Sequence, residues 1–325
     1  MAPKLKPNVI GYDPGFGNTK VCIDGKVSVV QSAVSIPRQT GLAAIGLKAA
    51  GRKVHVVNIN GHEFATGVGA GTRGQLKTSM DYSALSSLER RALFYSAAAE
   101  VLNGAMEDAL LVVGLPVPLL EDREQAGAVL ESLKQLKGEH TFETGHQSYS
   151  FSVSRIKVLA QPAGAYIDWA YDATLRVQPR AGSAKSEVLV LDIGLNTLDI
   201  YVLKNGQVLE SFIGGAEVGV KRLLELLTTN GHDLMEMDAE LRSGALRPEA
   251  ALIEGWLGEV LAAIKRTTPN LRRFDVVIPC GGGALVLGDR LRLALAAKGA
   301  AVHWPDNPVT TNVAGFYKYG LKTLG

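Results

Sequence analysis

The sequence predicts an α/β protein with two related domains around a ligand-binding cleft. Its 325 residues exceed what one compact core usually holds, which favours two domains with a cleft between them. A pattern of strand, Asp-x-Gly turn, strand, tight hairpin and strand occurs around Asp13 and again around Asp192. Such a repeat indicates two related domains. The 36 glycines predict many close backbone approaches within them.

The chain carries almost no net charge. Its 34 Lys and Arg residues and 32 Asp and Glu residues leave a net charge of +2, so no overall field draws the protein to nucleic acid or to an anionic membrane. We therefore expect no direct sequence-specific DNA binding. Apolar residues make up 46% of the chain and charged residues 20%, which are ordinary values for a globular protein.

The cysteines and the start of the chain indicate a cytoplasmic protein. Cys22 and Cys280 each lie in an apolar, strand-like run, which is typical of reduced thiols. Residues 1–7 are basic and polar and lack the apolar core of a secretory signal. The longest nearly apolar run, residues 109–120, contains two prolines and falls short of the roughly 20 residues of a membrane helix. We expect no membrane span.

The first half of the sequence alternates between strand and helix signals. Asp24-Gly25 and Asn60-Gly61 are hairpin turns of a type that tolerates positive φ. Ser83 or Ser86 is the expected cap of the first long helix. The expected strands are residues 9–13, 19–23, a hairpin within 54–64, 109–116 and 149–159, and the expected helices are residues 81–102, 120–136 and 162–171.

The second half begins after a polar, linker-like segment at residues 179–185 and repeats the opening pattern. Asn205-Gly206 takes the place of the earlier Asp24-Gly25 turn. The expected strands are residues 188–192, 197–203, 207–212 and 275–280, and the expected helices are residues 218–227, 234–242, 248–266, 285–298 and 313–322.

The two Asp-x-Gly turns suit phosphate binding. A glycine-rich turn directs several backbone N–H groups at one point, and side chains there would block the approach of a phosphate. Two such turns, one from each domain, would clamp a polyphosphate between them. Asp13 and Asp192 end the strands before the turns, where carboxylates hold the hydration shell of Mg²⁺. Lys20 reaches a phosphate oxygen as a point charge.

Each hairpin taken alone has a simpler explanation, because Asp and Gly are the ordinary residues of turns. The combination argues against that explanation. Both hairpins occur in matching contexts, and Gly281-Gly282-Gly283 follows a third strand. Three independent turns of this kind would be a coincidence.

These segments resemble the loops of a known superfamily. Residues 13–20, DPGFGNTK, resemble the phosphate-1 loop of the actin/Hsp70/sugar-kinase superfamily, and residues 192–197, DIGLNT, resemble its phosphate-2 loop. Residues 278–284 look like its adenosine motif and residues 159–165 like its first connecting segment. The four segments occur in the family's order and span nearly the whole chain. The resemblance implies an actin-like (ribonuclease H-like) fold with ATP or GTP and Mg²⁺ as cofactors.

The resemblance also assigns the site residues. It implies that Asp13 and Asp192 hold the metal, and that Gln161, Asp192 and Lys20 are catalytic. Gln161 would position the attacking water, because its position carries Gln or Glu in this fold; taken alone, it is also an ordinary helix N-terminal residue with a solvated amide. The implied nucleotide contacts are Asp13, Gly15, Phe16, Gly17, Asn18, Thr19, Lys20, Asp192, Gly194, Asn196, Thr197, Gly281, Gly282 and Gly283.

Two further segments narrow the resemblance. Gly114-Leu115-Pro116 and residues 312–320 look most like the ParM/StbA and archaeal actin-like branch. The resemblance then implies domain I at residues 1–165, with a small subdomain at about 32–85. It implies domain II at residues 166–325, whose last helix, at about 312–323, returns to domain I.

The resemblance favours a filament-forming ATPase. The bound nucleotide closes the domains, closed protomers polymerise head to tail, and hydrolysis weakens the filament. In the resembling proteins this positions plasmids through a small DNA-binding adaptor. Two alternatives are a small-molecule kinase, for which no further catalytic Asp is evident, and a nucleotide-dependent interaction protein that does not polymerise.

Three weaker signals point elsewhere. Residues 69–74 match G-x-G-x-x-G without the strand and helix of a dinucleotide site, so we expect a flexible surface loop, with a filament contact as the alternative. His140 and His146 are expected in a solvated loop and not as zinc ligands. Arg272 and Arg273 are expected on a solvated face, with a contact to an adaptor or a second protomer as the alternative.

Overall fold

A computed structural model describes residues 7–38, 54–77, 85–182, 186–227 and 233–324. Up to residue 182 the strands are β1 Val9–Pro14, β2 Asn18–Ile23, β3 Lys26–Gln31, β4 Val34–Ser35, β5 His55–Ile59, β6 His62–Thr66, β7 Met106–Leu115, β8 Gly138–Thr144 and β9 Gln147–Ala160. The α-helices of this part are α1 Leu88–Ala99, α2 Val117–Glu121, α3 Arg123–Lys134 and α4 Gln161–Ala170.

From residue 186 the strands are β10 Glu187–Ile193, β11 Leu198–Lys204, β12 Gln207–Val208, β13 Gly214–Ala216 and β14 Val276–Cys280. The α-helices are α5 Val220–Leu226, α6 Leu234–Ser243, α7 Ala250–Thr267, α8 Gly281–Leu287, α9 Asp289–Ala297 and α10 Thr311–Leu324.

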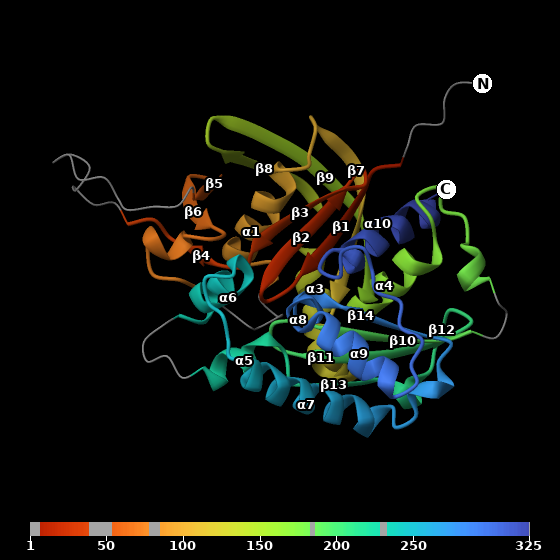
Figure 1. Cartoon of the computed structure of the whole chain (residues 1–325). Helices are drawn as coiled ribbons and strands as arrows, with labels where there is room; N and C mark the ends of the chain where they lie inside the picture. The colour runs from red at the N-terminus through yellow and green to blue at the C-terminus, as the bar shows by residue number, and fades with distance from the viewer. Residues whose placement is uncertain (1–6, 39–53, 78–84, 183–185, 228–232, 325) are drawn as a thin grey trace.

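Two sheets form the two lobes of the molecule (Figure 1). The strands of the first sheet are ordered β3-β2-β1-β7-β9-β8-β5-β6-β4, and those of the second β12-β11-β10-β14, with β13 also paired to β11. Each sheet contains a hairpin next to a parallel pair: β1 pairs antiparallel with β2 and parallel with β7, and β10 does the same with β11 and β14. The repeat in the sequence is thus a repeat of sheet topology.

The central strands are continuous apolar runs because they are covered on both faces. Strands β1 and β10 are buried along their whole length. In the first lobe Tyr12, Phe94 and Phe151 pack together, and in the second the fully buried Trp256 of α7 donates its indole N–H to the carbonyl of Val218. Each sheet therefore has its own apolar core.

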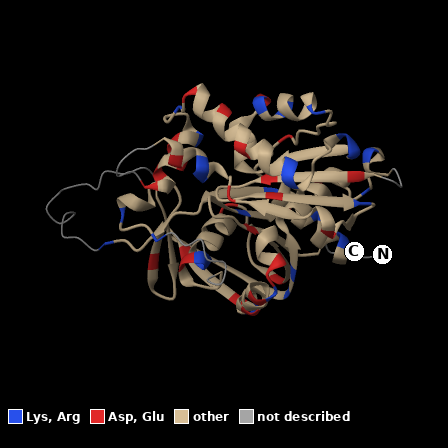
Figure 2. Cartoon of the chain, turned by 90° about the horizontal axis from the view of Figure 1, so that it is seen from below, with Lys and Arg blue, Asp and Glu red and all other residues tan. Residues whose placement is uncertain are grey.

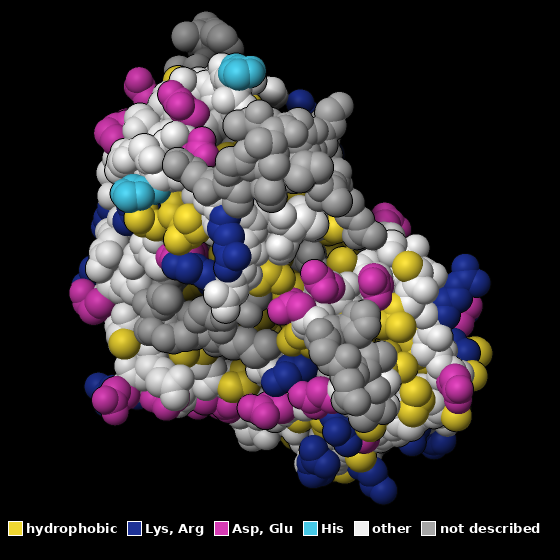
Figure 3. All heavy atoms as spheres, turned by 90° about the vertical axis from the view of Figure 1, so that its left-hand side faces the viewer, with side chains coloured by type: hydrophobic (Ala, Val, Ile, Leu, Met, Phe, Trp, Pro, Cys, Tyr) yellow, Lys and Arg dark blue, Asp and Glu magenta, His cyan; other side chains and the backbone are white. Residues whose placement is uncertain are grey.

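The lobes also touch beside α6. On this side of the molecule hydrophobic, basic and acidic side chains are interspersed (Figure 3). Ala33 and Ala70 of the first part of the chain lie in one apolar cluster with Met235 of α6. The Gln31 amide donates to the Met235 carbonyl at 2.6 Å, and Gln31 is buried. Basic and acidic residues alternate along the described helices and strands (Figure 2), in keeping with the small net charge.

Helix α10 closes the chain against the first lobe. It packs on α4, β1 and β7, and Val313 and Phe316 are fully buried in that contact. The crossing with α4 is close because two glycines meet there: a Cβ on Gly315 would lie only 1.8 Å from the carbonyl oxygen of Gly164. Lys318 then donates to the carbonyls of Asp168 and Tyr171 at the end of α4.

Several expected elements have different bounds. Ser87, and not Ser86, caps α1, while Ser83 lies outside the described residues. The expected single helix at 120–136 is two helices, since Asp122 interrupts it and its carboxylate caps α3. The expected strand at 207–212 ends at Val208 and is followed by a 3₁₀ turn.

The prediction that His140 is solvated is wrong. His140 lies on β8 and is 3% exposed, among Tyr95, Phe142 and Phe151. Its Nε2 donates to the Leu136 carbonyl at 2.9 Å, so Nδ1 accepts from the Tyr95 hydroxyl at 2.7 Å. Burial lowers the pKa of His140, which favours this neutral form.

The other two weak signals are residues 69–74 and the pair Arg272 and Arg273. Ala70 is fully buried at the start of a 3₁₀ turn, so residues 69–74 are not a surface loop throughout. Arg272 and Arg273 are both exposed, as expected for a solvated face. Arg273 is also paired: it donates to Glu187 at 2.5 Å and lies over the Phe212 ring. A filament contact by residues 69–74 stays a prediction.

The Gly164–Gly315 crossing predicts a strong packing effect. We expect Gly315→Ala to lower the free energy of unfolding by about 3 kcal/mol, because the new methyl group forces α4 and α10 apart. The matched control is Gly258→Ala in α7, where an added Cβ meets nothing within 4 Å. This change should raise stability by up to about 1 kcal/mol. Urea unfolding of both variants measures the difference, and equal stabilities would contradict the packing described.

Candidate functional site

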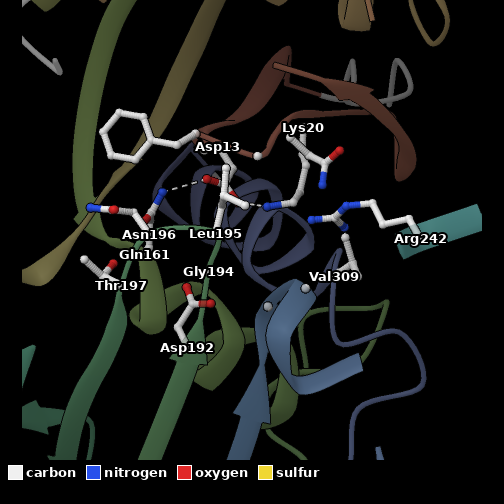
Figure 4. Close-up of a pocket in the computed structure, with 16 residues that line it drawn as sticks. Asp13, Lys20, Gln161, Asp192, Gly194, Leu195, Asn196, Thr197, Arg242 and Val309 are labelled. Carbon is white, nitrogen blue, oxygen red and sulfur yellow. Dashed lines mark hydrogen bonds and ion pairs between the residues drawn. The ribbon is translucent and has the colours of Figure 1, made fainter. Parts of the chain in front are cut away.

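A cavity of about 500 Å³, including its open mouth, lies between the two lobes (Figure 4). Its walls come from the turn after β1, the turn after β10, the start of α4, the start of α8 and the end of α6. A second cavity, of about 900 Å³, opens beside Gly67–Thr72 and α6. The charged residues that line it are Glu236 and Glu240, so the first cavity is the one that suits an anionic ligand.

The turn after β1 is held from the side of β3. Ser32 donates its hydroxyl to the carbonyl of Gly15 at 2.6 Å and its N–H to the carbonyl of Gly17 at 3.0 Å. Because C=O and N–H point in opposite directions in a trans peptide, the N–H groups that follow these carbonyls point away from Ser32. A Cβ on Gly15 would lie 2.7 Å from the carbonyl oxygen of Asn18, so this turn needs glycine.

The turn after β10 is held in the same way by α5. The N–H groups at the start of α5 donate to the turn: that of Gly219 to Asn196, that of Val220 to Gly194, and that of Lys221 to Leu195. These carbonyls are thereby bound on the side of the helix, and the following N–H groups point away from it. In both glycine turns the carbonyls are therefore hydrogen-bonded on one side, by Ser32 or by α5, and the N–H groups that follow them point to the other side.

The two turns face each other. A Cβ on Gly17 would lie 3.0 Å from the Cβ of Leu195, and Gly15 and Gly194 line the same cavity. Strands β1 and β10 thus bring their carboxyl ends to one place, although they are about half the chain apart in sequence.

The first acid of the cavity is paired. Asp13 is 1% exposed and accepts from Lys20 Nζ at 2.6 Å and from Gln161 Nε2 at 2.8 Å. Lys20 is the residue opposite Asp13 in the β1–β2 ladder, so the hairpin itself sets this ion pair. Figure 4 shows Lys20 and Gln161 approaching Asp13 from opposite sides.

The second acid is less well compensated. Asp192 accepts from Asn312 Nδ2 of α10 at 2.6 Å. Burial raises its pKa to about 6, since Lys20 opposes this shift only in part and the negative charge of Asp13 adds to it. A cation placed beside Asp192 would therefore relieve an unfavourable charge.

The glycines at the start of α8 lie at the carboxyl ends of the parallel strands β10 and β14. Strands β10 and β14 are parallel, with Asp192 opposite Cys280, so Gly281 follows directly at the same edge. Gly281 has φ 85°, and a Cβ there would meet Asp192 Oδ1 at 2.5 Å. The helix thus begins at Gly281 and not at residue 285 as expected.

Comparison with known proteins agrees with this geometry. Residues 11–164 match the family model for the N-terminal domain of actin-like proteins. The match covers 154 of the 325 residues. No curated protein sequence matches the chain closely enough to count as a relative.

The whole chain has the actin-like fold. The archaeal actin homolog Ta0583 superposes with a TM-score of 0.74 at 19% identity, over 97% of this chain and 99% of that one. The apo pSK41 ParM protein gives 0.69 at 19% identity over 98% of each chain. A 15-stranded ParM filament from Clostridium botulinum gives 0.67 at 16% identity, over 98% and 100%. The predicted actin-like fold is confirmed.

Most residues predicted for the site of this actin-like fold lie together. Those that line the cavity are Asp13, Gly15, Phe16, Gly17, Asn18, Lys20, Gln161, Asp192, Gly194, Asn196, Thr197, Gly281 and Gly282. Thr19 and Gly283 do not line it. The Thr19 hydroxyl is buried and bonds to that of Ser32, and Gly283 leaves room for the side chain of Ile193. Both residues support the walls of the cavity, and their role as nucleotide contacts stays a prediction.

The structure adds residues that the sequence analysis missed. Arg242 and Val309 line the cavity, and Asn312 binds Asp192. Asp199 lies opposite Asp192 in the β10–β11 ladder, is 2% exposed and accepts from the N–H of Val117. Burial and the charge of Asp192 raise its pKa to about 7. Of these residues, only Asp199 could have been found from the sequence, because it follows Asp192 in the run DIGLNTLD of residues 192–199.

Within the described residues, no helix is long and apolar enough to cross a membrane.

The raised pKa of Asp192 predicts a pH-dependent cost. Because the folded pKa of about 6 exceeds the ordinary value of 3.8, the charged form destabilises the fold above pH 6, and the cost disappears below pH 4. We expect Asp192→Asn to stabilise the protein in EDTA by about 1–2 kcal/mol at pH 8 and to have little effect at pH 4. The exposed Asp306 gives a control, Asp306→Asn. Urea unfolding at both pH values measures this, and a destabilised Asp192→Asn at pH 8 would contradict it.

Proposed function

We propose that this protein binds Mg²⁺ with ATP or GTP between its lobes, hydrolyses the nucleotide and assembles into filaments. The observation that carries the proposal is that two glycine turns, one from each sheet, line the same cavity. Their carbonyls are bound from behind by Ser32 and by α5. The N–H groups that point away from these supports form the anion-binding arrangement that a polyphosphate needs.

Magnesium fits the residues present. Among the described residues no group of three or more His, Cys, Asp or Glu side chains could hold a metal by themselves. Mg²⁺ is usually held by one or two carboxylates together with waters and substrate phosphates, and Asp13 and Asp192 are the carboxylates that line the cavity. The raised pKa of Asp192 means that its charged form is unfavourable in the cavity, and a bound cation would offset this free-energy cost. Bound Mg²⁺ would neutralise charge on the phosphates.

Gln161 is placed to orient water. Its amide nitrogen donates to Asp13 at 2.8 Å, which leaves the amide oxygen to accept from a water molecule. Gln is a weak base, but phosphoryl transfer depends mainly on positioning and on charge neutralisation. Lys20, fixed by Asp13, supplies positive charge next to the phosphates. A slow hydrolysis follows from this set of groups.

Because the cavity lies between the two lobes, we also propose that two domains close on the nucleotide. We propose domain I at residues 1–165, with the small subdomain at about 32–85, and domain II at residues 166–325. The boundary falls inside α4, on which α10 packs. The contact from Gln31 to Met235 crosses between the lobes, so nucleotide bound in the cavity would be coupled to domain closure.

Relatives support assembly and nucleotide binding. Similar folds have been solved as an Alp12 filament and as a ParM filament from Clostridium botulinum, and Ta0583 as a complex with ADP. We extend both properties to this chain. A cytoplasmic location, a DNA-binding adaptor and a role in plasmid or DNA segregation belong to the same proposal and rest on the family resemblance. Among the residues that the structure describes, Asp13 and Asp192 are the carboxylates that line the cavity, and no third one lines it to serve as the base of a small-molecule kinase.

Assembly is tested by sedimentation. We expect the wild-type protein to pellet with Mg-ATP or Mg-GTP and to stay in the supernatant with EDTA. Asp192→Ala should stay in the supernatant under both conditions, because it loses Mg-nucleotide binding. Negative-stain microscopy of the pellet identifies filaments. A wild-type protein that binds nucleotide but stays monomeric at every concentration and salt would end the filament claim.

Hydrolysis is tested at Gln161. We expect Gln161→Ala to lower the turnover of bound nucleotide by about 10–100-fold, because water loses its orientation. Affinity for Mg-ATP should change by less than about threefold, and filaments should persist longer. The exposed Gln207 provides the control variant, Gln207→Ala. Phosphate release and equilibrium binding separate the two effects; an equal loss of affinity and turnover would show that Gln161 only binds.

A further inference from the structure

We propose that Arg242 of α6 is a phosphate-binding residue of the cavity, supplied by the second lobe. The inference rests on the proposed function and assigns a ligand group to a side chain that the sequence motifs leave out. Its evidence is the position of the guanidinium, its anchor and its present partners.

The guanidinium lies between the glycine segments of both lobes. A Cβ on Gly282 would lie 3.0 and 3.1 Å from its two terminal nitrogens, and a Cβ on Gly17 would lie 3.4 Å from one of them. Figure 4 shows the side chain reaching from α6 into the cavity toward Lys20. The absence of side chains at Gly17 and Gly282 is what leaves room for the guanidinium and for a ligand beside it.

Asp238 holds the side chain of Arg242 in place. Arg242 Nε donates to Asp238 Oδ2 at 2.7 Å, one helical turn earlier on α6. Asp238 is fully buried, and its other oxygen has no partner among the described residues. A buried carboxylate of this kind needs its cation. The pair therefore locks the stem and directs the two terminal nitrogens of Arg242 toward the cavity.

The terminal nitrogens have a weak partner. With the Asn18 amide oriented so that its oxygen faces Arg242, this oxygen accepts from them at 3.0 and 3.2 Å. Asn18 belongs to the first glycine turn, so a neutral amide occupies the place where a phosphate oxygen would lie. A guanidinium with two parallel donors binds a phosphate more strongly than it binds an amide.

The charges of the cavity lead to the same assignment. Its lining contains two acids, Asp13 and Asp192, and two cations, Lys20 and Arg242. Lys20 is already held by Asp13 at 2.6 Å. A polyphosphate therefore needs Arg242 as well as Mg²⁺ to balance its charge. Because Arg242 lies on the second lobe and Asn18 on the first, a phosphate bound by both would also hold the lobes together.

The test compares ligands with and without a base. Arg242→Gln and Arg242→Lys are titrated with Mg-ATP, with magnesium tripolyphosphate and with adenosine by calorimetry. The control is Arg247→Gln, since Arg247 follows the same helix, is exposed and donates to the nearby Gly244 carbonyl. Thermal unfolding verifies that each variant is folded.

We expect Arg242→Gln to weaken both Mg-ATP and tripolyphosphate about 30-fold, Arg242→Lys to weaken them about fivefold, and Arg247→Gln to bind as the wild type does. Adenosine binding should be unchanged. Unchanged tripolyphosphate affinity in both Arg242 variants, or a weakening confined to ligands that contain the base, would overturn the assignment. A wild-type protein that binds none of these ligands would instead refute the proposed function.

Discussion

The close approach of two glycine turns in a buried cavity is the constraint on which the rest of the structure depends. It brings the buried carboxyl groups of Asp13 and Asp192 close together. Burial and the negative charge of Asp13 make the charged form of Asp192 unfavourable. The fold compensates one of them with Lys20 and leaves the other with an Asn312 amide. The charged form of Asp192 is therefore costly, and the Mg²⁺ that we propose in this cavity would offset that cost.

Much of the remaining structure supports these turns. Ser32 and the start of α5 hold the carbonyls of the two turns and so fix their shape. Helix α10 carries Asn312 to Asp192, and the Gly164–Gly315 crossing fixes how close α10 comes to α4. The end of the chain therefore contributes directly to the cavity, and packing far from the phosphates affects its geometry.

The sequence predicted what local chemistry determines. Apolar runs, Asp-Gly turns and the repeated hairpin gave most strands and both glycine turns, because these patterns act over a few residues. It could not place Arg242, which reaches the cavity because α6 lies at the contact between the lobes. Nor could it place His140, whose burial depends on Tyr95 and Phe151 from other elements. The start of α8 at Gly281 was missed because glycine is a poor helix former and only the parallel β10–β14 pair places it.

The central claim is that both turns hold one nucleotide, and hydrogen–deuterium exchange tests it most directly. Amides of residues 15–19 and of residues 194–197 are followed in the wild-type protein with EDTA, with Mg²⁺ alone and with saturating Mg-ATP. The account predicts that Mg-ATP slows exchange in both turns at the same nucleotide concentration and that Mg²⁺ alone does not. Slower exchange in one turn only, or in neither at saturation, would contradict it.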